Sequence, residues 1–284
     1  MNELKEIPYL GAGIGLRMEI AKDTLANNDE IEVVEVIAEH YFSGRHPNNV
    51  SPLLAEAQKR FPIIPHGVDL SIGSAAPLED FYLREAKALV ERLSAHYYSD
   101  HFCLTRDGDE LDIGHLSPLW YTKEMLDLVC SRVDTVQQFI GKPLVLENIT
   151  APFTIPENEY EEPEFITEVC RRTGCGLLLD VTNVFINGFN HKHDAQKMLE
   201  RYPMDHVVHM HLAGGFMENG QIIDSHSRPV NGINDGVWPL FEWAVMHSDV
   251  KAVIIERDDD FDDDFDEVIL HDLRHIKAIL AKKR

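Results

Sequence analysis

The fold class is decided by three consecutive stretches, FPIIPHGV (61–68), LEDFYLREAKALVERLSA (78–95) and AHYYSDHF (95–102). The first and last are short and apolar, and the middle one has apolar residues at helical spacing, so we expect a strand, a helix and a strand. Two parallel strands need a crossover between them, and a helix usually provides it. These stretches therefore favour an α/β fold with a parallel sheet.

The same alternation continues along the whole chain. Eight short apolar runs, each followed by a segment with helical patterning, lie at residues 11–17, 32–39, 61–68, 95–102, 143–149, 174–184, 206–214 and 250–258. Eight strand–helix units favour closure into a (β/α)₈ TIM barrel of ~250 residues over a doubly wound open sheet. GAGIG (11–15) gives the open sheet little support, because Leu16 stands where a dinucleotide fingerprint has its third glycine. We expect residues 1–284 to form one TIM-barrel domain.

The charge balance limits the partners. Asp and Glu number 49 against 26 Lys and Arg, and the formal net charge is −23. Nucleic acid and anionic membranes repel such a surface, so we expect neither as a partner.

The compartment is predicted to be the cytoplasm. No apolar run approaches the ~20 residues of a membrane span, and MNELKEIPYL (1–10) lacks the basic and apolar regions of a signal peptide. The cysteines are therefore expected to be reduced. None forms a C-x₂-C pair, which makes a thiolate zinc site unexpected, and they are Cys103, Cys130, Cys170 and Cys175.

Two acidic segments have ordinary interpretations. DDDFDDDFDE (258–267) is expected to be a solvated loop for most of its length, although Asp258 follows a predicted strand. RDGDELD (106–112) lacks the glycine and the final glutamate of a calcium loop, so we expect a turn.

Polar side chains of the kinds that bind metals follow six consecutive predicted strands. In a barrel the carboxyl ends of the strands form the active-site mouth, so these side chains are expected to converge. One such residue alone is more often part of the core or rim than a ligand. The strand ends carry His66, Asp100, His101, Glu147, Asn148, Asp180, Asn183, His209, His211 and Glu256, and the loop after strand seven carries Asp224 and His226.

The ligand types narrow the choice of metal. Imidazole and carboxylate without thiolate suit iron, manganese or zinc. The candidates exceed what one ion can use, so two or three ions are expected, and Glu147 is placed to bridge two of them. Hydrolysis or phosphoryl transfer at paired metals and oxygen chemistry at iron both remain open at this point.

The order of the motifs resembles a known family. HGVDLSIGSAAPL, SDHFC, PLVLEN, GCGLLLDVTNV, HMHLAGG, DSHSRPV and IIERDDDF resemble the DUF692 (UPF0276) family from about Gly11 to Asp260. That family is described as multinuclear non-haem iron-dependent oxidative enzymes. The resemblance implies a xylose-isomerase-like barrel with two or three irons. It further implies that O₂ is used to modify a ribosomally made precursor peptide, often at cysteine, with a small partner protein that presents the peptide.

The resemblance also assigns residues by their motif positions. Glu147, Asp180 and His211 are expected to be catalytic. The implied metal ligands are His66, His101, Glu147, Asp180, Asn183, His211, Asp224, His226 and Glu256.

Some positions depart from the family pattern. His40 replaces the asparagine of E-N-Y, His209 stands at a position that is usually acidic, and D-V-N-N appears as D-V-T-N. His191 in FNH matches a family position. We expect His40, His191 and His209 to contact substrate or to support the site.

The sequence thus predicts an iron-dependent oxidoreductase that uses O₂ to modify a peptide at cysteine, with manganese or zinc as alternative metals. A divalent-metal hydrolase or isomerase acting on a sugar or phosphate is the alternative function. An inactive peptide-binding scaffold that keeps its metal is a third.

Overall fold

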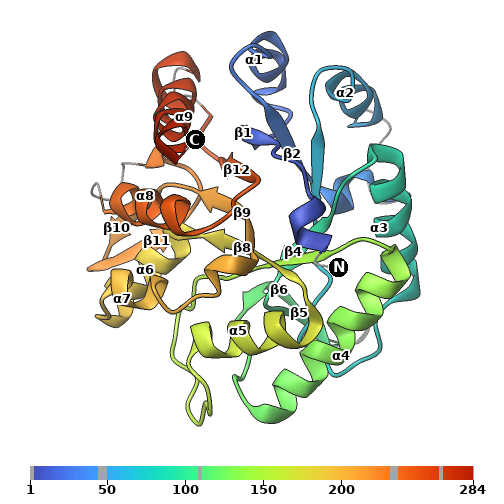
Figure 1. Cartoon of the computed structure of the whole chain (residues 1–284), viewed down its shortest axis with the longest axis vertical. Coiled ribbons are helices and arrows are strands. Elements are labelled where there is room, and N and C mark those ends of the chain that lie inside the picture. Colours follow the sequence, from blue (N-terminus) through green and yellow to red (C-terminus); the bar gives the residue numbers. More distant parts are fainter. Residues whose placement is uncertain (1–2, 44–49, 108–110, 231–235, 262–264, 284) are drawn as a thin grey trace.

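Eight parallel strands close into a barrel in the computed structural model, which describes residues 3–43, 50–107, 111–230, 236–261 and 265–283 (Figure 1). Around the barrel the strands follow the order β1-β12-β9-β8-β7-β4-β3-β2. Their bounds are Gly11–Gly15 (β1), Val33–Ile37 (β2), Ile63–His66 (β3), Tyr98–His101 (β4), Leu144–Glu147 (β7), Gly176–Asp180 (β8), Val207–Leu212 (β9) and Ala252–Ile255 (β12). The predicted (β/α)₈ TIM barrel is confirmed, and the open sheet is not formed.

Helices surround the strands in Figure 1. They are Ala21–Ala26 (α1), Val50–Ala57 (α2), Asp80–Leu93 (α3), Lys123–Ile140 (α4), Glu162–Thr173 (α5), Val181–His191 (α6), Ala195–Leu199 (α7), Val237–His247 (α8) and His271–Lys283 (α9). Among the described residues, no helix combines the length and the apolar character that crossing a membrane requires.

Local sequence signals set the ends of these helices. The Thr122 side chain accepts a hydrogen bond from the backbone N of Met125, and Gly141 adopts the left-handed conformation that ends α4. Glu161 and Glu164 form a capping box at the start of α5. The apolar faces of these helices then pack against the outer face of the barrel.

The sixth strand is shorter than the sequence predicts. The run at 174–184 forms β8 only as far as Asp180, and α6 begins at Val181. V-T-N-V is rich in β-branched residues and resembles a strand, but the Asp180 side chain caps the new helix by accepting from Asn183 N. The main helix after β8 is therefore α6, and the helical pattern that follows it at 194–202 forms only the short α7.

Two hairpins extend from the barrel. Leu104–Asp107 (β5) pairs with Leu111–Ser117 (β6), and residues 108–110 of the predicted turn lie outside the described residues. Gly215–Glu218 (β10) pairs with Gln221–Asp224 (β11), so this second hairpin delivers Asp224 to the site. The acidic segment 258–267 is not a loop throughout, because Phe265–Leu270 forms a π-helix; residues 262–264 lie outside the described residues.

The barrel interior changes from apolar to polar along the strands. Val33, Ile64, Val145 and Ile254 belong to a buried apolar cluster inside the barrel. Side chains two positions apart on a strand share a face. The next inward positions are therefore Glu35, His66, Glu147 and Glu256, and these form a polar layer on an apolar floor.

Candidate metal centre

Glu147 occupies the centre of the polar layer. Its Oε2 atom is 3.4 Å from His66 Nε2 and 3.3 Å from His101 Nε2. Its Oε1 atom is 3.4 Å from His211 Nδ1. All four side chains are buried. One carboxylate thus faces three imidazoles, which suits a ligand shared between two ions.

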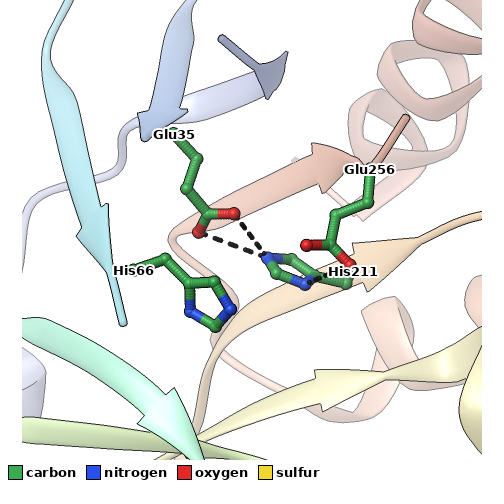
Figure 2. Close-up of side chains that lie close together, drawn as sticks. All are labelled: Glu35, His66, His211 and Glu256. Atoms are coloured by element: carbon green, nitrogen blue, oxygen red, sulfur yellow. Dashed lines mark hydrogen bonds and ion pairs between the residues drawn. The ribbon is translucent and has the colours of Figure 1, made fainter. Parts of the chain in front are cut away.

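His211 is held between carboxylates on both sides of its ring. Nε2 is 3.1 Å from Glu35 Oε1, and Nδ1 is 3.1 Å from Glu256 Oε2. Figure 2 shows Glu35 and Glu256 approaching opposite sides of the ring, with His66 nearby. When Nε2–H donates a hydrogen bond to Glu35, Nδ1 remains as a possible metal ligand on the side of Glu147 and Glu256.

His226 forms the outer part of the cluster. Its Nε2 atom is 2.9 Å from Asp224 Oδ1, and its Nδ1 atom is 3.4 Å from Glu256 Oε2 and 3.3 Å from Asp258 Oδ2. Asp258 is in turn paired with Arg17 at 2.6 Å. His226 has a φ of 47°, a left-handed conformation that costs energy and is common at functional sites. Glu256 therefore connects the inner and outer parts of the cluster.

The start of α6 orients Asp180 and Asn183. Asp180 Oδ1 accepts a hydrogen bond from Asn183 N at 2.7 Å, and Asn183 Nδ2 donates to the backbone oxygen of Asn148 at 3.0 Å. The remaining oxygens, Asp180 Oδ2 and Asn183 Oδ1, are buried and have no hydrogen-bond partner within the described ranges. A helix cap thus fixes both residues and leaves one oxygen of each available to a metal.

The charges of the cluster depend strongly on one another. Burial opposes the protonation of His211, but Glu256, Glu35 and Glu147 raise its pKa well above the ordinary value. Burial would raise the pKa of Glu256, yet His211 and His226 hold it well below the usual range. Burial and the charge of Glu147 raise the pKa of Asp180 well above normal. Such shifts are typical of functional sites.

The donor set fits metal ions. Unpaired buried polar atoms are costly, and in the part of the chain that the structure describes most of them belong to the predicted ligands or to Glu35. Four sets of potential ligand atoms each lie within 4.8 Å of one another. These sets are Glu35, His66, His211 and Glu256; His66, His101 and Glu147; Glu147, Asp180, His211 and Glu256; and His226, Glu256 and Asp258. Nitrogen and oxygen donors without sulfur suit iron, manganese or zinc.

The predicted metal ligands converge, whereas the predicted substrate contacts lie apart. His40 is exposed on the 3-10 turn Ala38–Tyr41 after β2. His191, at the end of α6, is 2.7 Å through Nε2 from the backbone oxygen of Ala151. His209 is fully buried beneath the polar layer, 3.6 Å from Glu35 Oε2. Substrate contact by these three histidines stays a prediction.

Sequence reasoning missed Glu35 as a member of the cluster and left Asp258 undecided. Glu35 lies in the middle of β2 rather than at its end, so inspection of the strand ends passed over it. The available signal was an acidic residue inside the run V-V-E-V-I, because an unpaired buried carboxylate is costly.

Comparison with known proteins bears on the identity of this cluster. Residues 11–281 match the family described as the RiPP precursor modification enzyme MbnB/TglH/ChrH. The chain belongs to this family. MbnB/TglH/ChrH membership agrees with the curated relatives, which carry the name UPF0276 protein. The relative from Caulobacter vibrioides is 37% identical over 256 residues, 89% of each chain, and that from Rhizorhabdus wittichii is 38% identical over 253 residues, 87% of each chain. The DUF692 (UPF0276) resemblance is confirmed.

Solved structures share the fold of this MbnB/TglH/ChrH member. An L-ribulose 3-epimerase has a TM-score of 0.63 at 14% identity, covering 96% of this chain and 95% of its own. A xylose isomerase domain protein from Alicyclobacillus acidocaldarius has a TM-score of 0.58 at 13% identity, covering 95% of this chain and 99% of its own. The expected xylose-isomerase-like barrel is thereby confirmed. At such identities the likeness concerns the fold alone.

Proposed function

We propose that this protein is an iron-dependent oxidase or oxygenase that uses O₂ to modify a ribosomally made peptide at a cysteine residue. The observation that carries the proposal is the overlap of the buried ligand sets. Glu147 is common to two of them and Glu256 to three, so two or three ions would share ligands. The family, described as acting on RiPP precursors, supplies the peptide substrate.

The side chains divide among the proposed ions by their distances. His66, His101 and Glu147 would hold one ion, and Asp180 and His211 would join Glu147 and Glu256 at a second. The outer ion would be held by His226, Asp258 and Glu256, with Asp224 adjacent to His226. Iron bound there would supply redox chemistry, with O₂ as the oxidant and the peptide as the electron source.

The surrounding residues would hold this arrangement. Glu35 orients His211 by accepting a hydrogen bond from its Nε2–H, and Arg17 orients Asp258 through two contacts, of 2.8 and 2.6 Å. The apolar floor that includes Val33 and Ile254 excludes water from below the cluster. Support of this kind limits the movement of the ligands and tunes the metal.

The alternative function, a sugar hydrolase or isomerase, is supported by the barrel fold. The epimerase likeness extends to the fold alone, and one fold carries many chemistries. We therefore retain the peptide substrate, together with a small partner protein that presents it, as the resemblance implies.

The test is O₂ consumption by iron-loaded protein supplied with a synthetic peptide library that has one fixed cysteine. The expected result is O₂ uptake and a cysteine-dependent change in peptide mass, both absent from a library with serine at that position. The Glu147→Ala variant should abolish both. Epimerisation of free ketoses without any peptide turnover would contradict the proposal.

A further inference from the structure

A pocket of about 550 Å³ lies beside the metal centre, between the segment that follows β7 and helix α6. Its walls include the aromatic side chains of Tyr121, Phe153, Tyr160 and Tyr202. Phe153 is 55% exposed, although it is a large apolar residue. Exposed aromatic surface beside a concave site is typical of ligand-binding regions.

One face of α6 connects the pocket to the metal centre. Asn183, Asn187 and His191 follow one another at four-residue spacing, so they lie along the same side of the helix. Asn183 binds the backbone oxygen of Asn148, and Asn187 binds both Ile149 O at 3.0 Å and Ala151 N at 2.8 Å.

The segment bound by this face of α6 contacts the metal centre at one point and the pocket at another. Thr150 Oγ1 donates to Asp224 Oδ2 at 3.1 Å, whereas Ala151 and His191 line the pocket. The pocket and the ligand cluster are therefore separated by one short stretch of chain.

The pocket is acidic. Five glutamates line it and no lysine or arginine does, within the described part of the chain. Three of them are engaged elsewhere: Glu159 accepts from Lys123 N at 2.7 Å, and Glu161 and Glu164 both pair with Arg201. Helix capping and surface ion pairs therefore account for these three glutamates.

Glu162 is different. The residue is partly exposed, but its carboxyl group is buried and interacts with the hydroxyl of Tyr202, and no cation within the described ranges pairs with it. Burial, partly offset by the Tyr202 hydrogen bond, raises the pKa of Glu162 to about 7. A buried carboxylate without a counter-charge is costly, and a ligand cation would remove that cost.

The chemistry of the walls selects the kind of cation. Aromatic rings attract ammonium and guanidinium groups through their faces. Lysine and arginine also carry aliphatic stems that pack against apolar walls. A side chain with both features matches a pocket whose walls combine Glu162 with Tyr121, Tyr202 and Phe153.

We propose that this pocket binds a lysine or arginine side chain of the peptide substrate and thereby positions the peptide over Ala151 toward the metal centre. The inference rests on the proposed function in one respect, namely that the substrate is a peptide.

The test measures binding to the full-length protein and needs neither turnover nor O₂. Three fluorescein-labelled synthetic peptides, Gly-Ser-Leu-Xaa-Leu-Ser-Gly with lysine, norleucine or glutamate at Xaa, are titrated by fluorescence anisotropy. The lysine peptide should bind roughly tenfold more tightly than the norleucine peptide, with the advantage reduced by added salt. The glutamate peptide should bind most weakly.

The variants assign that preference to the pocket. Glu162→Gln should remove the advantage of lysine over norleucine, and Phe153→Ala should weaken both peptides. Glu168→Gln is the matched control on α5, since Glu168 pairs with Arg171 and does not line the pocket.

Equal binding of the lysine and norleucine peptides, or a lysine preference that survives Glu162→Gln, would overturn the proposal. The proposed function is tested separately by metal content and O₂ uptake. An active iron enzyme without the lysine preference would refute only the pocket, and the reverse result would refute only the iron chemistry.

Discussion

Glu35 and His211 are 176 positions apart in the chain, and their side chains meet at 3.1 Å inside the barrel. A metal-binding histidine commonly donates its second ring N–H to a carboxylate, which fixes the tautomer and the ring orientation. Glu35 provides this partner on β2, whereas Glu147 and Glu256 lie on the other side of the ring. The position of Nδ1 thus depends on a residue outside the predicted ligand set.

Removal of the Glu35 carboxylate should weaken metal binding without unfolding the barrel. We expect Glu35→Ala to lower iron affinity about 10- to 100-fold, because the His211 ring loses its orienting partner. Glu35→Gln should have a smaller effect, since its amide oxygen still accepts from Nε2. Anaerobic titration with Fe(II) against a competing chelator measures this. Glu30→Gln, at a surface residue paired with Arg274, is the control. If Glu35→Ala bound iron as tightly as this control, the orienting role of Glu35 would be refuted.

Two substitutions separate the structural and metal-binding roles of Asp180. Asparagine retains an oxygen that can accept from Asn183 N, whereas alanine removes the helix cap. In metal-free protein, Asp180→Ala should therefore have a free energy of unfolding about 1 kcal/mol below that of Asp180→Asn. Both should bind less iron than the native protein, because both lose the Oδ2 carboxylate charge. Urea denaturation and metal analysis test this, and native iron content in Asp180→Asn would exclude Asp180 as a ligand.

Replacement of His209 by an apolar residue should stabilise the protein. It is fully buried, and neither ring nitrogen has a hydrogen-bond partner within the described ranges. In metal-free protein, His209→Leu should raise the free energy of unfolding by about 1 kcal/mol, because an unsatisfied polar group is removed. His206→Leu should destabilise, since His206 Nδ1 is 2.9 Å from Cys175 O. Urea denaturation compares the two variants. A loss of stability in His209→Leu as large as that in His206→Leu would show that His209 has a hydrogen-bond partner in solution.

The residues at strand ends could be predicted because barrel geometry brings the carboxyl ends of parallel strands together. His66, Glu147 and Asp180 follow directly from this rule. The middle of a strand carries no such marker, which is why Glu35 was missed. The start of α6 was missed for another reason, because its β-branched residues favour a strand and the Asp180 cap overrides that preference.

The pocket beside the site could not be predicted from the sequence. Its walls come from the segment before α4, from the residues between β7 and α5, and from α6 and its continuation. The motifs on α6, D-V-T-N and FNH, do not indicate that these segments meet. Their proximity depends on the packing of α4, α5 and α6 against one side of the barrel (Figure 1).

The pKa of Glu162 predicts a pH dependence of stability. This pKa is raised from the ordinary glutamate value of 4.5 to about 7 in the folded protein, so over that range the folded state holds more protons than the unfolded state. The contribution of Glu162 to stability should therefore fall as the pH rises from about 4.5 to about 7 and then level off. Glu162→Gln should reduce this slope in urea denaturation, whereas Glu168→Gln, whose native carboxyl has its pKa lowered by Arg171, should not. Parallel curves for Glu162→Gln and the native protein would argue against a raised pKa.

The central claim is that the barrel holds a cluster of iron ions, and metal content tests it most directly. The protein is purified anaerobically with iron-57 available, analysed by mass spectrometry for bound metals, and examined by Mössbauer spectroscopy. We expect two or three irons per chain with coupled spectra, because the ligand sets share Glu147 and Glu256. Absence of bound metal, or stoichiometric zinc or manganese in the presence of iron, would contradict the account.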